Sequence, residues 1–172
     1  QGRRVLGRVE ARVGGELRAS KATQIRGLYV TVAVGSTANR PVAQVAESAL
    51  KGGAAAIELR LGSETKAEGL SLAGDLLRPC ESYKALFFVG VEGDLAAAAG
   101  SHGLRLGGSD LPVPEARTML TPHQLVGLSV AAIDEATDSQ AQTVDYMVLG
   151  PLFAKDRSTA ASPGLAALTQ IK

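Results

Sequence analysis

Short apolar runs recur along the chain, and most of them lack the polar alternation of a half-exposed strand. Each run is rich in Val, Leu, Ile or Phe and ends at Gly or a polar residue; the six runs span residues 28–33, 56–61, 85–90, 103–106, 125–130 and 146–150. Apolar runs of this length are typical of strands that are buried on both faces of a parallel sheet. The pattern predicts six such strands.

The segments between the runs have the spacing of amphipathic helices. The clearest one follows a cap region at Asn39 and Pro41 and places five apolar side chains on one face, those of Val42, Val45, Ala46, Ala49 and Leu50. A second, over residues 66–83, turns four side chains inward: Leu70, Ala73, Leu76 and Leu77. Further helices are predicted over residues 94–99, 114–120 and 134–142. This alternation predicts an α/β domain, either a doubly wound sheet or a (β/α)8 barrel, and the spacing does not separate the two.

Residues 1–26 differ from the rest and form a segment of their own, ahead of a domain over residues 27–172. Arginines alternate with apolar residues there as in a basic amphipathic helix, which Gly14 and Gly15 are expected to interrupt. One interpretation is a surface helix packed on the amino-terminal end of the domain. The other is an arm that docks on a partner or a membrane surface.

The charge balance and the aromatic content narrow the classes of partner. The 172 residues hold 18 Lys and Arg against 17 Asp and Glu, a formal net charge of +1, so no overall field attracts nucleic acid. Aromatic residues make up 3%, which leaves little for stacking on bases. No apolar run approaches the roughly 18 residues of a membrane helix. We expect neither a nucleic-acid partner nor a membrane span.

Cys80 is the one cysteine, so the chain can form no internal disulfide and no zinc site of several cysteines. This predicts a soluble protein of a reducing compartment, either the cytoplasm or an organelle matrix such as the plastid stroma. The first residue is Gln1 and not Met, so a longer precursor stays open.

Candidate chemistry stands at or after the carboxyl ends of the predicted strands, where parallel α/β folds place their reactive groups. Glu58 and Arg60 are two residues apart and point to the same side of a strand, where Arg105 could join them in a charge cluster or an internal salt bridge. Lys155 and Arg157 follow the last run and offer a basic loop for a phosphate.

Two segments are specific enough to suggest a family: Gly103-Leu-Arg-Leu-Gly-Gly-Ser-Asp-Leu-Pro and Asp145-Tyr-Met-Val-Leu-Gly-Pro-Leu-Phe. With shorter pieces in unbroken order from Gly27 to Leu168, they resemble the thiamin phosphate synthase and TenI family. The resemblance implies the (β/α)8 barrel, with about six of its eight βα units in this chain. Synthases of this family join a pyrimidine pyrophosphate to a thiazole phosphate using Mg²⁺, and TenI members bind or tautomerise the thiazole phosphate.

This chain matches only some of the residues with which the family binds its anionic substrate. Synthases show Gln-x-Arg-x-Lys on the second strand, where this chain has Glu58, Arg60 and Gly62, so a carboxylate stands where the pyrophosphate is expected. Ser129 matches a serine near the pyrophosphate, and the loop after the sixth strand stays basic. The phosphate-binding candidates are Arg60, Ser129, Lys155 and Arg157.

This chain matches even fewer of the residues that the family has at its metal site. Gly90 and Val91 replace an Asn-Asp pair whose Asp helps to hold Mg²⁺, and a valine cannot ligate a metal. Asp110 matches the second carboxylate on the metal side and is the one metal candidate. Arg105 replaces a histidine that TenI members use. The cofactor implied is Mg²⁺, if the chain is active.

These exchanges favour a barrel domain that has lost catalysis and acts as a structural or assembly subunit of a larger complex. Its expected partners are other protein subunits or further copies of the chain, because the two missing barrel units leave the domain incomplete at its C-terminus. The alternative is an active thiamin phosphate synthase, or a TenI-like binder or tautomerase, that handles a phosphorylated small molecule. A third interpretation gives the N-terminal basic helix the leading role as a docking arm.

Overall fold

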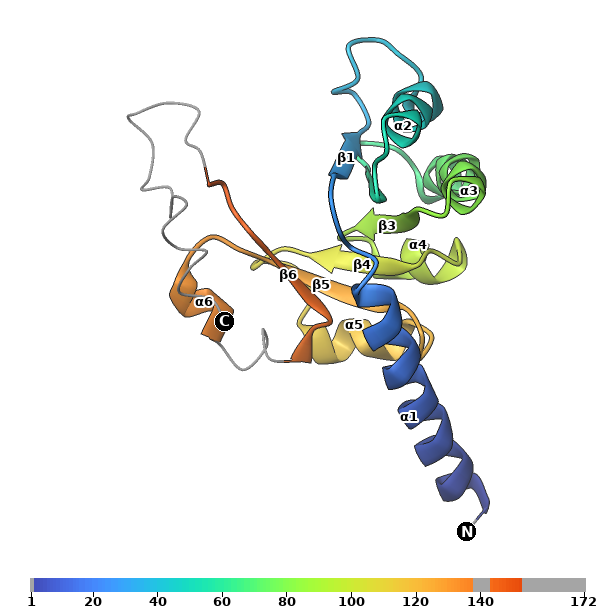
Figure 1. Cartoon of the computed structure of the whole chain (residues 1–172), viewed down its shortest axis with the longest axis vertical. Helices are drawn as coiled ribbons and strands as arrows, with labels where there is room; N and C mark the ends of the chain where they lie inside the picture. Colours follow the sequence, from blue (N-terminus) through green and yellow to red (C-terminus); the bar gives the residue numbers. More distant parts are fainter. Residues whose placement is uncertain (1, 138–142, 153–172) are drawn as a thin grey trace.

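The computed structural model describes residues 2–137 and 143–152 (Figure 1). Its strands form one parallel sheet in the order β1-β2-β3-β4-β5-β6. The strands are Tyr29–Ala33 (β1), Ala56–Arg60 (β2), Leu86–Gly90 (β3), Gly103–Leu106 (β4), Leu125–Val130 (β5) and Tyr146–Leu149 (β6). Each apolar run predicted from the sequence is therefore a strand, and the parallel arrangement is confirmed.

Helices connect successive strands, as parallel pairing requires. They are α2 (Val42–Lys51), α3 (Lys66–Ser82), α4 (Gly93–Ala98), α5 (Val113–Met119) and α6 (Ile133–Thr137), while α1 (Gly2–Ala22) precedes β1. Thr65 caps α3 in a reciprocal arrangement with Glu68, whereas Pro41 precedes α2 without a side-chain cap. Of the helix predicted over residues 134–142, the part at 138–142 lies outside the described residues.

The sheet is curled into a half-barrel. Inward-facing side chains of its first and last strands meet, because the hydroxyl oxygens of Tyr29 on β1 and Tyr146 on β6 lie 3.4 Å apart. Both rings also contact Phe88 of β3, with centroids 5.4 Å and 5.3 Å away. A flat doubly wound sheet would keep its first and sixth strands far apart. The curl identifies the barrel-like alternative, with six of its strands in the described part of the chain, as predicted.

The main apolar core lies between the outer face of the sheet and the helices, with residues such as Ile57, Leu76 and Leu104 fully buried. One inward prediction was wrong, since Leu70 of α3 is 43% exposed. Gly69 takes the buried position, where a Cβ would lie 2.6 Å from the Leu61 side chain. A hydrophobic pattern counts apolar side chains, so it does not reveal a glycine at a buried position. Gly69 is buried there because the Leu61 side chain comes so close.

The N-terminal helix α1 is continuous through Gly14 and Gly15, which corrects the predicted interruption. A Cβ on Gly14 would lie 2.6 Å from the Pro122 carbonyl oxygen, so the missing side chain permits close packing instead of breaking the helix. The part of α1 after Gly14 lies against the amino-terminal end of the sheet, while the part before it projects away (Figure 1). The packed interpretation holds for the second part. The division of the chain at residues 26 and 27 stays a prediction.

Candidate functional site

A buried ion pair crosses the inside of the half-barrel between β2 and β4. Glu58 is fully buried, and its carboxylate accepts hydrogen bonds from Arg105 Nη2 at 2.6 Å and from Arg105 Nε. The hydrogen bond to Glu58 raises the pKa of Arg105. This fork geometry neutralises the carboxylate within the protein. The cluster predicted from the sequence is confirmed in its position and in its ion pair.

Local sequence explains how two charged groups fit inside the sheet. Arg105 lies opposite Gly90 in the β3–β4 register. A Cβ on Gly90 would come within 2.9 Å of Glu58 Oε1, so only glycine leaves room for the carboxylate beside that strand. Gly90, which the resemblance matches to an asparagine of the family, therefore leaves space for the ion pair.

Arg60 lies at the carboxyl end of β2 and is the less engaged arginine of the cluster. Its side chain is 45% exposed, and its Nε lies 3.8 Å from Glu58 Oε1. That separation is beyond hydrogen-bonding distance. Among the described residues, Arg60 is the cationic side chain of this cluster that can turn toward an anion from solvent.

Arg105 also reaches β5. Its Nη1 donates a hydrogen bond to Ser129 Oγ, so a single guanidinium joins the Glu58 carboxylate to the Ser129 hydroxyl. Two of the phosphate candidates, Arg60 and Ser129, are thereby placed on either side of one ion pair.

Two tyrosines complete this interior, and sequence reasoning missed both. The Tyr29 hydroxyl donates to Glu58 Oε2 at 2.9 Å and lies next to the Tyr146 hydroxyl. Burial is the main cause that raises the pKa of each phenol, so both stay protonated. The available signal was a tyrosine near the start of each of two apolar runs. The contact between the two tyrosines depends on the curl of the sheet, which the sequence does not give.

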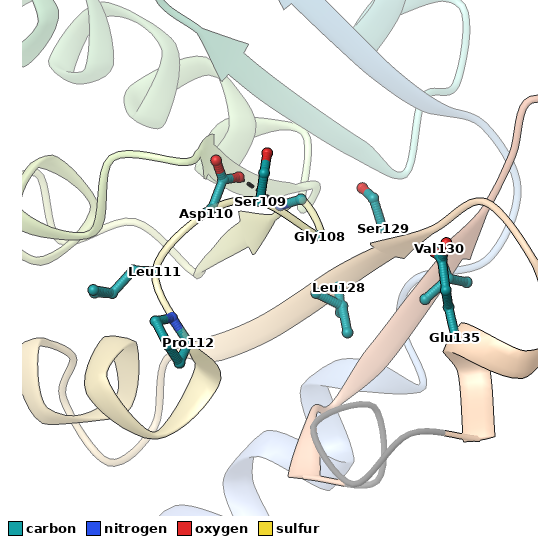
Figure 2. Close-up of a pocket in the computed structure, with 10 residues that line it drawn as sticks. Gly108, Ser109, Asp110, Leu111, Pro112, Leu128, Ser129, Val130 and Glu135 are labelled. Carbon is teal, nitrogen blue, oxygen red and sulfur yellow. Dashed lines mark hydrogen bonds between the residues drawn. The ribbon is translucent and has the colours of Figure 1, made fainter.

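A cavity of about 500 Å³ opens beside Ser129, between the loop after β4 and the end of β5 (Figure 2). Asp110 and Ser109 line it from the loop, and Glu135 lines it from α6. The Gly107 amide donates to Asp110 Oδ2 at 2.6 Å, which fixes the loop around the carboxylate. Asp110 and Ser129, predicted separately, therefore face one cavity. The contributions of Ser109 and Glu135 were not predicted.

The described residues do not fit a magnesium ion held by several protein carboxylates. No group of three or more His, Cys, Asp or Glu side chains gathers anywhere in residues 2–137 and 143–152. Val91, which the resemblance matches to the family's other carboxylate, offers no side-chain ligand atom, and Asp110 already accepts from a backbone amide. Magnesium stays a prediction from the resemblance, with Asp110 as its one candidate ligand.

The remaining phosphate candidates, Lys155 and Arg157, lie outside the described residues. None of the helices in the described part of the chain is long and apolar enough to cross a membrane.

The fold and the site define an α/β-barrel type of protein with its candidate binding groups at the carboxyl ends of the strands. The chain belongs to the thiamine monophosphate synthase family, whose model matches residues 28–172. It is 37% identical over 155 residues to a thiamine-phosphate synthase of Anaeromyxobacter dehalogenans, covering 89% of this chain and 67% of the relative. It is 34% identical over 147 residues to that of Moorella thermoacetica, covering 84% and 70%.

A solved structure shows the same fold. Thiamine phosphate pyrophosphorylase from Pyrococcus furiosus is similar with a TM-score of 0.76 at 29% sequence identity, over 87% of this chain and 70% of that one. The family resemblance and the barrel-like fold inferred from the sequence are thereby confirmed.

The expectation of a catalytically inactive structural or assembly subunit was wrong. The relatives are named as thiamine-phosphate synthases, and none of these comparisons indicates an inactive subunit. The expectation counted Glu58 as a negative charge opposed to an anionic ligand. In the structure Arg105 neutralises that carboxylate, so Glu58 is no longer an argument against ligand binding. Which partner proteins the chain has stays a prediction.

Proposed function

We propose that this chain binds a phosphorylated small molecule at the carboxyl ends of its strands and acts as a transferase of the thiamine-phosphate synthase type. The reaction joins a pyrimidine pyrophosphate to a thiazole phosphate. The observation that carries the proposal is the exposed Arg60 guanidinium, held near a neutralised carboxylate and on the same interior as Ser129.

The chemistry of the transfer explains the need for such groups. The bond between the pyrimidine's carbon and its pyrophosphate oxygen breaks, and that carbon bonds to the thiazole nitrogen. The pyrophosphate leaves with the electron pair of the broken bond, so negative charge grows on it. A guanidinium and a hydroxyl donor that meet this charge lower the barrier, because they interact more strongly with the transition state than with the substrate. In this proposal Arg60 supplies the charge and Ser129 the hydrogen bond.

The purified chain tests the proposal directly. With both substrates and Mg²⁺ present, we expect thiamin phosphate to form, measured by chromatography after oxidation to its fluorescent product. Arg60→Gln should lower the rate at least tenfold. Arg78→Gln is the matched control, because Arg78 lies exposed on α3 and pairs with Asp75. Absence of product with the wild-type chain would contradict the transferase proposal.

A second candidate is a TenI-like protein that binds a thiazole phosphate without joining it to a pyrimidine. The observation that favours it is that the described residues form no metal cluster, since binding a phosphate ester needs only donors such as Arg60 and Ser129. Saturable binding of thiazole phosphate in calorimetry, with no product in the assay above, would select this candidate.

A further inference from the structure

We infer that Arg105 is a positioning residue, which turns the Ser129 hydroxyl into a donor toward an anionic phosphate oxygen and keeps Arg60 available to the same ligand. The inference rests on the proposed function and deepens it, because it assigns a role to Arg105, whose guanidinium bonds to Glu58 and Ser129. Two features of the Arg105 guanidinium carry it.

The first feature is the direction of the bond to Ser129. A hydroxyl has one hydrogen to donate, whereas a guanidinium has donors and no acceptor. Since Arg105 Nη1 donates to Ser129 Oγ, the serine hydrogen cannot point back at Arg105. No other partner of this hydroxyl occurs among the described residues, and Ser129 lines the cavity at the end of β5. That hydrogen is therefore available to an acceptor in the cavity.

The second feature is the saturation of Glu58. Its two oxygens accept from Arg105 Nε, from Arg105 Nη2 and from the Tyr29 hydroxyl. With these donors in place the carboxylate has little need of Arg60, which stays 3.8 Å away and 45% exposed. Without Arg105, the buried carboxylate would draw in the Arg60 guanidinium and compete with a ligand phosphate for it.

Both effects select the same ligand chemistry. The site presents a cation and an outward hydroxyl hydrogen, so it favours a group that only accepts hydrogen bonds and carries negative charge. A phosphate ester or a pyrophosphate meets this requirement, and an uncharged hydroxyl or amide does not.

A mutant cycle with inorganic pyrophosphate tests the inference, with affinities measured by calorimetry on the full chain. In the wild-type background we expect Ser129→Ala to weaken binding about tenfold. In the Glu58→Gln, Arg105→Gln background the same change should weaken it less than twofold, because the hydroxyl is no longer oriented. Arg60→Gln should cost the same factor in both backgrounds, since neither leaves an unpaired Glu58 charge.

Equal losses for Ser129→Ala in the two backgrounds would overturn the inference while leaving the proposed function intact. Failure of the wild-type chain to bind pyrophosphate would overturn the proposed function, and this inference with it. Arg105→Lys guards against a background that fails to fold, because it keeps a positive charge near Glu58 but lacks the fork that reaches Ser129. It should behave in the cycle as the double variant does, and a full tenfold Ser129→Ala loss there would also overturn the inference.

Discussion

Two carboxylates of this fold, Asp145 and Glu58, each meet two arginines, but the arginines differ in what else they contact. Asp145 precedes β6 and pairs with Arg18 of α1 at 3.0 Å and with Arg117 of α5 at 2.6 Å. Both arginines also donate to main-chain carbonyls in the segment before β5. In this amino-end cluster (Asp145, Arg18 and Arg117), the guanidinium donors bond to groups of the protein itself. These contacts link α1, α5 and β5.

In the interior cluster (Glu58, Arg60 and Arg105), only Arg105 is held by hydrogen bonds to the protein in this way. Arg105 is largely buried and holds Glu58 in a fork, while Arg60 reaches toward solvent from the end of β2. The two clusters therefore differ in a property that distinguishes a structural charge cluster from a binding one, which is how far the arginines are engaged by their own chain. Arginines fully engaged by their own chain stabilise the fold, and an arginine left at the rim beside a satisfied carboxylate is placed to bind.

Removal of Arg105 should break the interior cluster with the largest effect. Arg105→Met leaves the buried Glu58 carboxylate without its main partner, so we expect the free energy of unfolding to fall by about 3–5 kcal/mol in urea denaturation. Adding Glu58→Gln removes the uncompensated charge and should recover most of the loss. A double variant no more stable than Arg105→Met alone would show that the buried charge is not the cause.

Loss of the Asp145 charge should separate stability from binding. Asp145→Asn weakens contacts to two arginines and to the Val126 amide, which donates to Asp145 Oδ2 at 2.7 Å. We expect a loss of about 2–3 kcal/mol in the free energy of unfolding, with pyrophosphate affinity changed less than twofold. A folded variant whose affinity fell tenfold would place Asp145 in the binding machinery and break the comparison.

The docking of α1 on the amino-end cluster can be tested with two adjacent glycines. Gly14→Ala forces a Cβ against Pro122 and should cost about 1–2 kcal/mol. Gly15→Ala is the matched control, because the nearest atom to its Cβ would be 3.8 Å away, and helix propensity should make it more stable by up to about 1 kcal/mol. Equal effects at both positions in thermal unfolding would mean that α1 does not pack as described.

A smaller effect concerns pH and His102, which lies at the same end of the sheet as Asp145. Its Nδ1 accepts a hydrogen bond from the Phe87 amide at 3.0 Å, and burial lowers its pKa below the ordinary 6.5. The unfolded chain therefore takes up this proton first, and stability is lost as the pH falls from above 6.5 toward the pKa of the folded state.

His102→Asn keeps an acceptor without a titrating group. We expect the loss of stability between pH 7 and pH 5 to shrink by about 1 kcal/mol, measured by urea unfolding at each pH. A pH dependence equal to that of the wild-type chain would assign the acid sensitivity to other groups.

The sequence predicted local features of this molecule better than distant contacts. Apolar runs located all six strands, and the two-residue spacing of Glu58 and Arg60 placed both on one face. The contact of Tyr29 with Tyr146 was missed because it depends on how far the sheet curls. The pairing of Arg18 with Asp145 was missed because these residues are 127 positions apart and no local pattern relates them.

The error about function has a physical source of the same kind. The sequence offered Arg105 as a possible partner of Glu58, but whether the two groups pair depends on how β2, β3 and β4 align, which no local pattern gives. Glu58 therefore counted as an obstacle to an anion until the structure showed the Arg105 fork on its carboxylate. The roles of Lys155 and Arg157 stay predictions.

The most direct test of the contrast between the two clusters is an amide chemical-shift map of the full chain titrated with inorganic pyrophosphate. We expect saturable shifts at the carboxyl ends of the strands, around Arg60, Asp110 and Ser129, and unchanged amide signals around Arg18 and Asp145. Shifts confined to the amino-end cluster, or none at millimolar pyrophosphate, would contradict this expectation.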